Sequence, residues 1–214
     1  MKLLLLGKNG QVGWELQRSL APLGDVVALD RQVIGGDIAD LDRLAQMIRT
    51  MAPDVIVNAA AHTAVDKAES EPDLAMRLNA EAPEIMAQEA LSLGALLVHY
   101  STDYVFEGSD SHPHKEGDAT APLSVYGKTK LEGEQRIVAT GCRHLIFRTS
   151  WVYSARGSNF IKTILKLAQE QEELSVINDQ WGAPTGADLI ADITSHAIRH
   201  VVANKQDMSL YHLS

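Results

Sequence analysis

Five short apolar runs alternate with longer amphipathic segments along the chain, and this alternation limits the fold more than any other feature. The runs lack the polar alternation of half-exposed strands, which predicts parallel strands that are buried on both faces. Strands that alternate with helical segments predict right-handed crossovers and a doubly wound, parallel α/β sheet. The runs are Leu3–Leu6, Val26–Leu29, Val55–Val57, Leu96–Tyr100 and Leu145–Phe147.

Amphipathic segments separate these runs, and the pattern loosens after Ser150. The polar segment Glu107–Leu123 contains Gly, Ser, His and Pro and predicts a long loop, of a length that is often functional. A short strand is expected at Leu210–Leu213. The predicted helices are Val12–Leu23, Leu41–Met51, Pro72–Leu93, Val125–Ala139, Phe160–Glu170 and Asp188–Val202.

Three glycines, Gly7, Gly10 and Gly13, lie between the first predicted strand and the first predicted helix. Glycines at such a junction allow a tight turn, close approach of the backbone to a pyrophosphate, and close packing of helix on strand. The helix N-terminus, with Gln11 and Val12, then presents free N–H groups to the phosphates. We therefore expect a Rossmann-type domain that binds a nicotinamide dinucleotide; the alternative is a glycine turn that only packs.

Asp30 ends the second predicted strand, where an acidic side chain can bond the hydroxyls of the adenosine ribose. An Asp at this place favours NADH. Arg31 follows directly and is suited to a 2′-phosphate, so NADPH stays open as a cofactor. The alternative for Asp30 is a turn residue.

Small residues follow the third predicted strand. Ala59, Ala60 and Ala61 let the backbone approach a cofactor closely. His62 comes next and is either a residue of the ligand site or a hydrogen-bonded structural histidine.

Tyr126 and Lys130 are four residues apart at the start of a predicted helix, so they share one face. A free tyrosine has a pKa of about 10, and a nearby ammonium stabilises its phenolate and eases proton exchange with a carbonyl oxygen. Thr102 lies at the carboxyl end of a strand, where its hydroxyl can bond the same oxygen. These three residues are the predicted catalytic set; the alternative is a surface Tyr/Lys pair and a threonine that caps the strand end. Lys130 can also bond the ribose of the cofactor, so Tyr126 and Lys130 are also predicted to contact the cofactor.

Charge and cysteine content exclude several kinds of partner. A net charge of −9 disfavours nucleic acid, which requires a concentrated basic surface. Cys142 is the single cysteine of the sequence, and we expect no secretory leader and no membrane-spanning segment. These features favour a cytoplasmic protein.

Longer strings of residues resemble one enzyme family. The G-x-x-G-x-x-G spacing is similar to that of the extended short-chain dehydrogenase/reductases, and the strings together resemble the dTDP-4-dehydrorhamnose reductases of that superfamily. The resemblance implies NAD(P)H-dependent reduction of the C4 keto group of a dTDP-sugar, in dTDP-rhamnose and O-antigen lipopolysaccharide biosynthesis. The strings are Gly7–Leu16, Asn58–Asp66, Ser101–Phe106, Arg148–Tyr153 and Asp179–Thr185.

The resemblance also implies roles for individual positions. Thr102, Asp103, Tyr104 and Trp151 would meet the sugar nucleotide, and the alternative for Trp151 is core packing after the last strand. Tyr126 would donate the proton, supported by Lys130. The positions that would line the cofactor are Gly10, Gln11, Val12, Asp30, Asp37, Ile38, Ala61, His62, Thr63 and Tyr100.

A magnesium ion that bridges carboxylates of two subunits is also implied, and with it a homodimer. Glu15 matches one such position, and Asp188 stands where a Glu is usual. Both are equally suited to be solvated acids on helix surfaces. His196 and His200 are four residues apart, and a solvated helix face is the favoured interpretation for them.

The expected organisation is a dinucleotide-binding domain at 1–150 and part of a smaller substrate-binding region at 151–214. The family's chains continue beyond Ser214, so this smaller region is expected to be incomplete. Two other functions share the scaffold. A sugar-nucleotide dehydratase would carry Thr-Asp-Glu, whereas Tyr104 follows Asp103 here, and an epimerase belongs to the same group. The other alternative is the non-catalytic regulatory subunit of methionine adenosyltransferase.

Overall fold

A six-stranded parallel sheet forms the centre of the molecule in the computed structural model, which describes residues 1–109, 112–204 and 209–214. The strand order is β2-β1-β3-β4-β5-β8. The chain leaves β1 toward β2 and then returns to the other side of β1, so the topological switch point lies between β1 and β3. The strands are β1 (Lys2–Leu6), β2 (Asp25–Leu29), β3 (Val55–Asn58), β4 (Leu96–Thr102), β5 (His144–Thr149) and β8 (Ser209–His212).

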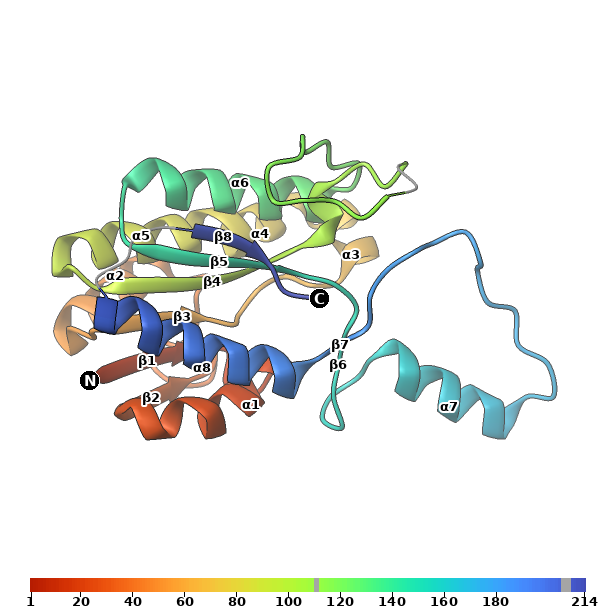
Figure 1. Ribbon diagram of the computed structural model, residues 1–214, viewed down its shortest axis with the longest axis horizontal. Coiled ribbons are helices and arrows are strands. Elements are labelled where there is room, and N and C mark those ends of the chain that lie inside the picture. Colours follow the sequence, from red (N-terminus) through yellow and green to blue (C-terminus); the bar gives the residue numbers. More distant parts are fainter. Residues whose placement is uncertain (110–111, 205–208) are drawn as a thin grey trace.

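Helices cover both faces of this sheet, which makes a three-layer α/β/α arrangement (Figure 1). One face packs against α1 (Gln11–Leu20) and α8 (Ala187–Asn204), which also contact each other. The opposite face packs against α2 (Leu41–Met51), α5 (Ala82–Leu93) and α6 (Val125–Thr140). The predicted Rossmann-type, doubly wound sheet is confirmed.

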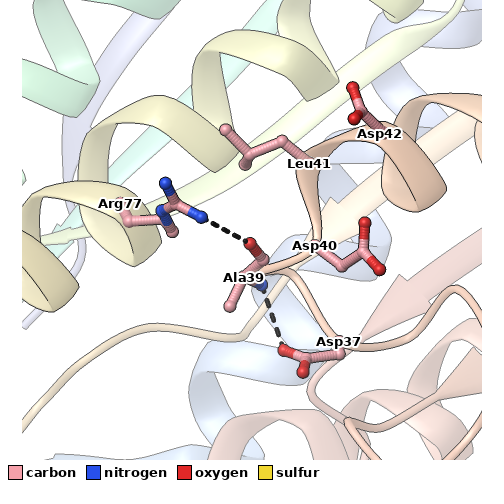
Figure 2. Close-up of a pocket in the computed structure, with 6 residues that line it drawn as sticks. All are labelled: Asp37, Ala39, Asp40, Leu41, Asp42 and Arg77. Atoms are coloured by element: carbon pink, nitrogen blue, oxygen red, sulfur yellow. Dashed lines mark hydrogen bonds between the residues drawn. The ribbon is translucent and has the colours of Figure 1, made fainter.

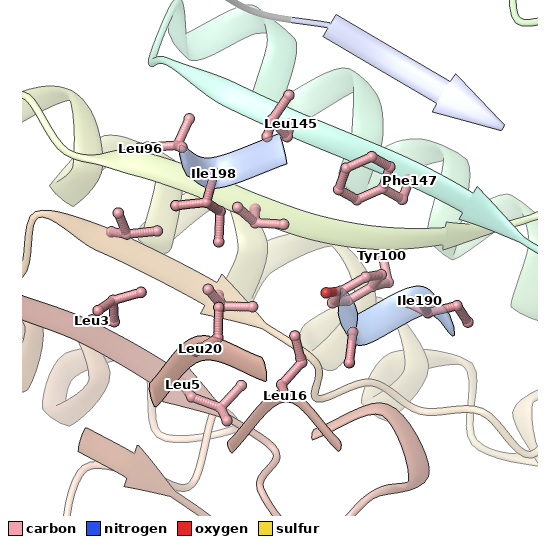
Figure 3. Packing of buried hydrophobic residues seen from close by; sticks show 14 of the residues in the cluster. Leu3, Leu5, Leu16, Leu20, Leu96, Tyr100, Leu145, Phe147, Ile190 and Ile198 are labelled. Carbon is pink, nitrogen blue, oxygen red and sulfur yellow. The ribbon is translucent and has the colours of Figure 1, made fainter. Parts of the chain in front are cut away.

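Successive side chains of a strand supply the two cores in turn. Leu3 and Leu5 of β1 pack with Leu16 and Leu20 of α1, and Ile190 of α8 joins them (Figure 3). Leu4 and Leu6 point to the opposite core. Full burial of one such side chain contributes about 1.5–3 kcal/mol, so continuous apolar runs are needed to hold both helical layers.

The five predicted strands are confirmed within two residues, and the strand predicted near residue 210 pairs with β5 as β8. β2 differs from the expectation of burial on both faces: it is the edge strand, and its residues are at best partly buried. The loop predicted over Glu107–Leu123 contains no helix or strand among its described residues, and 110 and 111 lie outside them.

The predicted helices are confirmed, with one internal change. The segment expected as one helix at Pro72–Leu93 comprises α4 (Pro72–Met76), a π-helical turn (Arg77–Glu81) and α5. Three short elements were not predicted: α3 (Val65–Ser70) and the two-residue strands β6 (Val152–Tyr153) and β7 (Thr185–Gly186). A 3₁₀ turn at Ala21–Leu23 closes the predicted first helix, and another, Asp103–Val105, follows β4.

The segment 151–214 divides between two places. α8 and β8 belong to the main sheet and its helical layer, whereas α7 (Phe160–Glu170) lies apart from the sheet (Figure 1). No residue of α7 is buried, and 171–184 forms no helix or strand. None of the described helices is both long and apolar enough to span a bilayer.

Candidate active site

The glycine loop between β1 and α1 lies at the switch point and packs against the backbone that follows β3. Gly7 has φ +87°, and a Cβ atom there would lie 2.7 Å from the carbonyl carbon of Ala59 and 2.8 Å from the nitrogen of Ala60. A Cβ at Gly13 would collide with the Gly7 carbonyl oxygen. The first and third glycines are therefore required by packing within the chain.

Gly10 has a different reason to be a glycine. A Cβ there would meet only the Gly7 oxygen at 3.4 Å and the Ala59 oxygen at 4.0 Å, which are ordinary contacts. Gly10 is also the N-cap of α1, and no side chain caps that helix end. An open, uncapped helix N-terminus is suited to receive a phosphate group.

Asp30 lies at the end of β2 and is tied to the glycine loop. Its carboxylate accepts a short hydrogen bond from the Asn9 amide, accepts another of 2.8 Å from the Gln32 N–H, and lies 3.6 Å from Lys8 Nζ. The turn contact with Gln32 matches the alternative considered for Asp30, but the Lys8 and Asn9 contacts place it beside the loop. Arg31 is exposed next to it.

Two open hollows lie beyond Asp30. The larger, about 500 Å³, is lined by Asp37, Ala39, Asp40, Leu41, Asp42 and Arg77 (Figure 2). The smaller, about 210 Å³, is lined by residues that include Arg31, Asp37 and Arg43. Asp37 is exposed and accepts a 3.0 Å hydrogen bond from the Ala39 N–H, whereas Ile38 is 5% exposed and belongs to the core. Asp37 is thus accessible to a ligand, and Ile38 lies behind it.

His62 is firmly held by its neighbours. Its backbone N–H donates to Asn79 Oδ1 (2.8 Å), the Asn79 amide donates to the His62 carbonyl (3.1 Å), and its Nε2 lies 3.3 Å from a Glu71 carboxylate oxygen. These bonds match the structural interpretation of His62. Its Nδ1 atom is nevertheless buried without a hydrogen-bond partner. Ala59, Ala60 and Ala61 are half-buried, and Thr63 is exposed.

Thr102, Asp103 and Ser150 form a hydrogen-bonded group at the ends of β4 and β5. The Thr102 hydroxyl donates to Asp103 Oδ1 (3.1 Å), and the Ser150 hydroxyl donates to Asp103 Oδ2 (2.8 Å). Tyr126, at the start of α6, lies close enough to Thr102 for the threonine hydroxyl to act on its pKa, and the Tyr104 ring packs edge-on against it at 5.6 Å. The structure therefore brings Tyr126 and Thr102 together, as predicted.

The Lys130 side chain does not take the expected direction. Its Nζ lies 3.1 Å from His99 Nε2 and donates to the Tyr100 carbonyl at 2.6 Å. Burial and the nearby Asp103 carboxylate outweigh the lowering effect of Thr102 and raise the pKa of Tyr126 to about 12. Lys130 does not contribute to this pKa in the arrangement described, because its amine is bonded to partners on β4 and not to the phenol; its support of Tyr126 stays a prediction. Burial lowers the pKa of Lys130 itself to about 8.

The family model described as the RmlD substrate binding domain matches residues 1–214. The chain belongs to this family. Curated relatives named dTDP-4-dehydrorhamnose reductase are 60% identical in Salmonella typhimurium and 58% in Escherichia coli, covering 100% of this chain and 72% of each relative.

Solved structures agree with this RmlD-family membership. A dTDP-4-dehydrorhamnose reductase from Clostridium acetobutylicum has a TM-score of 0.90 at 39% identity, covering 100% of this chain and 74% of the other. A dTDP-4-dehydrorhamnose reductase from Bacillus anthracis, solved in complex with NADP, has a TM-score of 0.89 at 36% identity with the same coverage.

Gln11 of the RmlD-family chain is occupied by contacts within the protein. Its Oε1 accepts from Asn159 Nδ2 (2.9 Å) and from the Ser154 hydroxyl (3.3 Å), and its Nε2 donates to the Val152 carbonyl (3.3 Å). Gln11 therefore joins the glycine loop to the segment after β5. Tyr100 also turns away from the site: its hydroxyl pairs with Thr194 at 2.8 Å in the core. Val12 packs at the edge of the same core.

Trp151 has a strained backbone and an accessible ring. Its φ is +43°, in the left-handed region that non-glycine residues rarely adopt, and it is 42% exposed. A Cβ on Gly182 would lie 2.5 Å from the Trp151 indole, so the ring packs directly on that glycine. The alternative of core packing is therefore wrong, and strain of this kind is common at ligand sites.

The predicted magnesium ligands do not form a site within the chain. Glu15 lies 3.7 Å from Arg18 in an ion pair, and Asp188 is exposed near Gly186. Across residues 1–109, 112–204 and 209–214, no three His, Cys, Asp or Glu side chains gather as a metal site would require. The part of the chain that the structure describes therefore holds no metal site of its own, and a magnesium ion between two subunits stays a prediction.

Two residues of the site were not predicted from the sequence: Ser150, which bonds to Asp103, and His99, which lies against Lys130. A signal for His99 was present. It stands inside a continuous apolar strand, where a buried polar side chain needs a partner. Ser150 gave no such signal, because it follows the strand at a place where a hydroxyl is common.

Proposed function

We propose that this chain catalyses the NAD(P)H-dependent reduction of the C4 keto group of dTDP-4-dehydro-L-rhamnose, which gives dTDP-L-rhamnose. The nearness of the Tyr126 and Thr102 side chains carries this proposal, since both hydroxyls lie at the carboxyl edge of the sheet, where one substrate oxygen could meet them. Relatives named for this activity, at 58–60% identity over the whole chain, give the proposal its substrate.

The residues present fit a dinucleotide. Gly10 and the uncapped N-terminus of α1 would hold the pyrophosphate, and Asp30 and Asp37 would meet the adenosine end. The bound nicotinamide would supply the hydride that reduces the carbonyl carbon. We propose that both NADH and NADPH serve, because Asp30 favours a free ribose hydroxyl while Lys8 and Arg31 favour a phosphate.

Tyr126 would donate the proton. With a pKa raised to about 12, its hydroxyl stays protonated at neutral pH and is ready to give a proton to the carbonyl oxygen as negative charge develops there. The Thr102 hydroxyl would hold the same oxygen. The phenolate left behind requires a nearby cation, which is the role we assign to Lys130.

We assign residues 1–150 to dinucleotide binding and, within 151–214, the segment 151–184 to part of the substrate site, whereas α8 and β8 complete the main sheet and its helical layer. Asp103, Tyr104 and Trp151 would contact the sugar nucleotide, supported by the half-exposed rings of Tyr104 and Trp151. We also propose a homodimer, supported by the exposed Trp14, Leu189 and Ile193 on α1 and α8, and a cytoplasmic setting, supported by the single cysteine. Light scattering tests the dimer.

The test is an assay of NAD(P)H oxidation with a dTDP-4-keto-6-deoxysugar as substrate. Oxidation is followed as the loss of the absorbance of the reduced nicotinamide. Turnover that requires both the sugar nucleotide and Tyr126 supports the reductase. Binding of the dinucleotide without any turnover would favour a regulatory subunit, and loss of water from a dTDP-hexose would favour a dehydratase.

A further inference from the structure

His99 is a fully buried histidine that the proposed mechanism does not use. It lies on β4 on the face covered by α6 and is 1% exposed. Its two ring nitrogens both have partners: Nδ1 lies 3.1 Å from the Asn58 amide nitrogen, and Nε2 lies 3.1 Å from Lys130 Nζ. The ring therefore connects β3 to the amine of the predicted catalytic lysine.

The backbone fixes the direction of the first bond. The Ala60 N–H donates to Asn58 Oδ1 at 3.1 Å, so the other end of that side chain, the NH₂ group, faces the histidine. An NH₂ group can only donate, and His99 Nδ1 must accept. The ring is then neutral with its proton on Nε2, which points at Lys130.

A histidine N–H that faces Lys130 requires an acceptor, and only a neutral amine has a lone pair to offer. The amine can still donate one of its own hydrogens to the Tyr100 carbonyl at 2.6 Å. If Lys130 carries a third proton, two hydrogen-bond donors must face each other at one of three contacts. These are Lys130 with His99, His99 with Asn58, and Asn58 with the Ala60 N–H. Unpaired buried donors are costly, so this chain of bonds favours the neutral amine.

We propose that His99 is a positioning residue that controls the protonation of Lys130, held by Asn58 in the tautomer that donates to the lysine nitrogen. The inference rests on the proposed reductase function for its consequence in catalysis, but its structural part can be measured without turnover.

The other charged groups around Lys130 do not replace this effect. Glu134 lies one helical turn further along α6 and favours the ammonium form, but its carboxylate makes two bonds to Arg148 of β5, at 3.0 and 2.7 Å. Tyr126, one turn before Lys130, is neutral at physiological pH. Burial lowers the pKa values of both Lys130 and His99, in the direction that the hydrogen-bond chain requires.

Control of Lys130 by His99 should affect the rate of reduction at alkaline pH. Stabilisation of a Tyr126 phenolate requires the ammonium form of Lys130, so reduction should slow as pH rises through the pKa of Lys130, near 8. His99 would therefore set the upper pH limit of the reaction. Beyond that limit the rate should fall about tenfold per pH unit.

The first experiment measures the tautomer of His99 and the pKa of Lys130 directly in the wild-type chain. Two-bond ¹H–¹⁵N correlation spectra report the tautomer of each histidine, and lysines labelled with ¹³C at Cε report the pKa of Lys130, whose signal is identified by its loss in Lys130→Met. We expect His99 to be neutral with its proton on Nε2 from pH 5.5 to 9. A proton on Nδ1, or a charged ring, would overturn the proposal.

Two uncharged substitutions test the coupling. His99→Gln can accept from Asn58 and donate to Lys130, as the ring does, and should leave the pKa of Lys130 within about 0.3. Asn58→Ser keeps an acceptor for the Ala60 N–H but lets His99 change tautomer, and should raise the pKa of Lys130 by about one unit. An unchanged pKa in Asn58→Ser, with a folded protein, contradicts the proposal.

The last measurement is the pH dependence of the reduction rate in the two variants. The alkaline limit of reduction should move upward in Asn58→Ser and stay in place in His99→Gln, which a merely structural role of His99 would not produce. If the wild-type chain does not reduce the dTDP-sugar at all, the proposed function fails, while the tautomer and the lysine titration still decide the inference about His99.

Discussion

Ser150 donates a hydrogen bond of 2.8 Å to Asp103, and this bond joins the ends of β4 and β5 beside the predicted catalytic tyrosine. The Thr102 hydroxyl donates to the other oxygen of the same carboxylate. Asp103 therefore has a fixed orientation, and Thr102 is held through it. The arrangement makes the position of the Thr102 hydroxyl depend on a residue of the neighbouring strand.

Replacement of Ser150 by alanine should remove this orientation. We expect kcat/KM for the dTDP-sugar to fall about three- to tenfold, the effect of one hydrogen bond, with the Kd of NADPH unchanged. Steady-state kinetics and calorimetric titration measure the two quantities. Ser150→Thr keeps a hydroxyl and is the matched control; an equal loss in both variants would mean that packing, not the bond, matters.

Tyr126→Phe should lower kcat by about two to four orders of magnitude and leave cofactor affinity within a few-fold, because only the proton donor is removed. The phenyl ring keeps its packing against Tyr104. Stopped-flow measurement of NADPH oxidation tests this. Turnover near the wild-type rate would exclude Tyr126 as the donor.

Asp30→Ala should shift the ratio of kcat/KM values toward NADPH. The carboxylate that repels a 2′-phosphate disappears, and Lys8, now 3.6 Å from Asp30, becomes available to the phosphate. Kinetics with both cofactors at equal ionic strength measure the ratio. Asp30→Asn removes the charge with less change of shape and should shift the ratio in the same direction; no shift in either variant would place Asp30 outside the ribose site.

Glu134→Gln should destabilise the protein by about 3–5 kcal/mol, because it leaves the Arg148 guanidinium buried without its counter-charge. Both side chains are at most 7% exposed, and they are joined by two hydrogen bonds. The free energy of unfolding in urea is the measurement. The double substitution Glu134→Leu/Arg148→Met should recover part of the loss; a double variant less stable than Glu134→Gln would contradict this explanation.

Stability should fall as pH falls below about 6.5, the pKa of a histidine in the unfolded chain. Burial holds the pKa values of His99 and His144 below that value, so the unfolded chain takes up protons that the folded one does not. Each such group contributes a slope of at most about 1.4 kcal/mol per pH unit. Urea unfolding between pH 7.5 and 5 tests this. The free energy of unfolding should change less steeply with pH in His99→Gln than in the wild type; equal slopes would mean that His99 does not contribute to the pH dependence.

The sequence was sufficient for the sheet and for the Tyr126–Thr102 pair, because both depend on local patterns. Continuous apolar runs identify buried strands, and strand ends gather at one edge of a parallel sheet. The pairing of β6 with β7 could not be predicted from the sequence, since two-residue strands carry no periodic signal.

The direction of the Lys130 side chain was also beyond the sequence. Its helical spacing from Tyr126 correctly gives a shared face, but a long side chain ends wherever buried hydrogen-bond partners are available. Those partners, the Tyr100 carbonyl and the His99 ring, come from another element. The direction of the Lys130 side chain is therefore determined by the packing of α6 on β4.

The long excursion between β5 and β8 has a consequence for how this chain can vary. β5 ends at Thr149 and pairs with β8, which begins at Ser209, while α7 and residues 171–184 leave the sheet in between. Loop-closure entropy grows only with the logarithm of length, so doubling such a segment costs about 0.6 kcal/mol. Insertions and deletions between β6 and β7 should therefore change the surroundings of Trp151 with little effect on the sheet, which leaves the specificity of the site free to diverge on a constant scaffold.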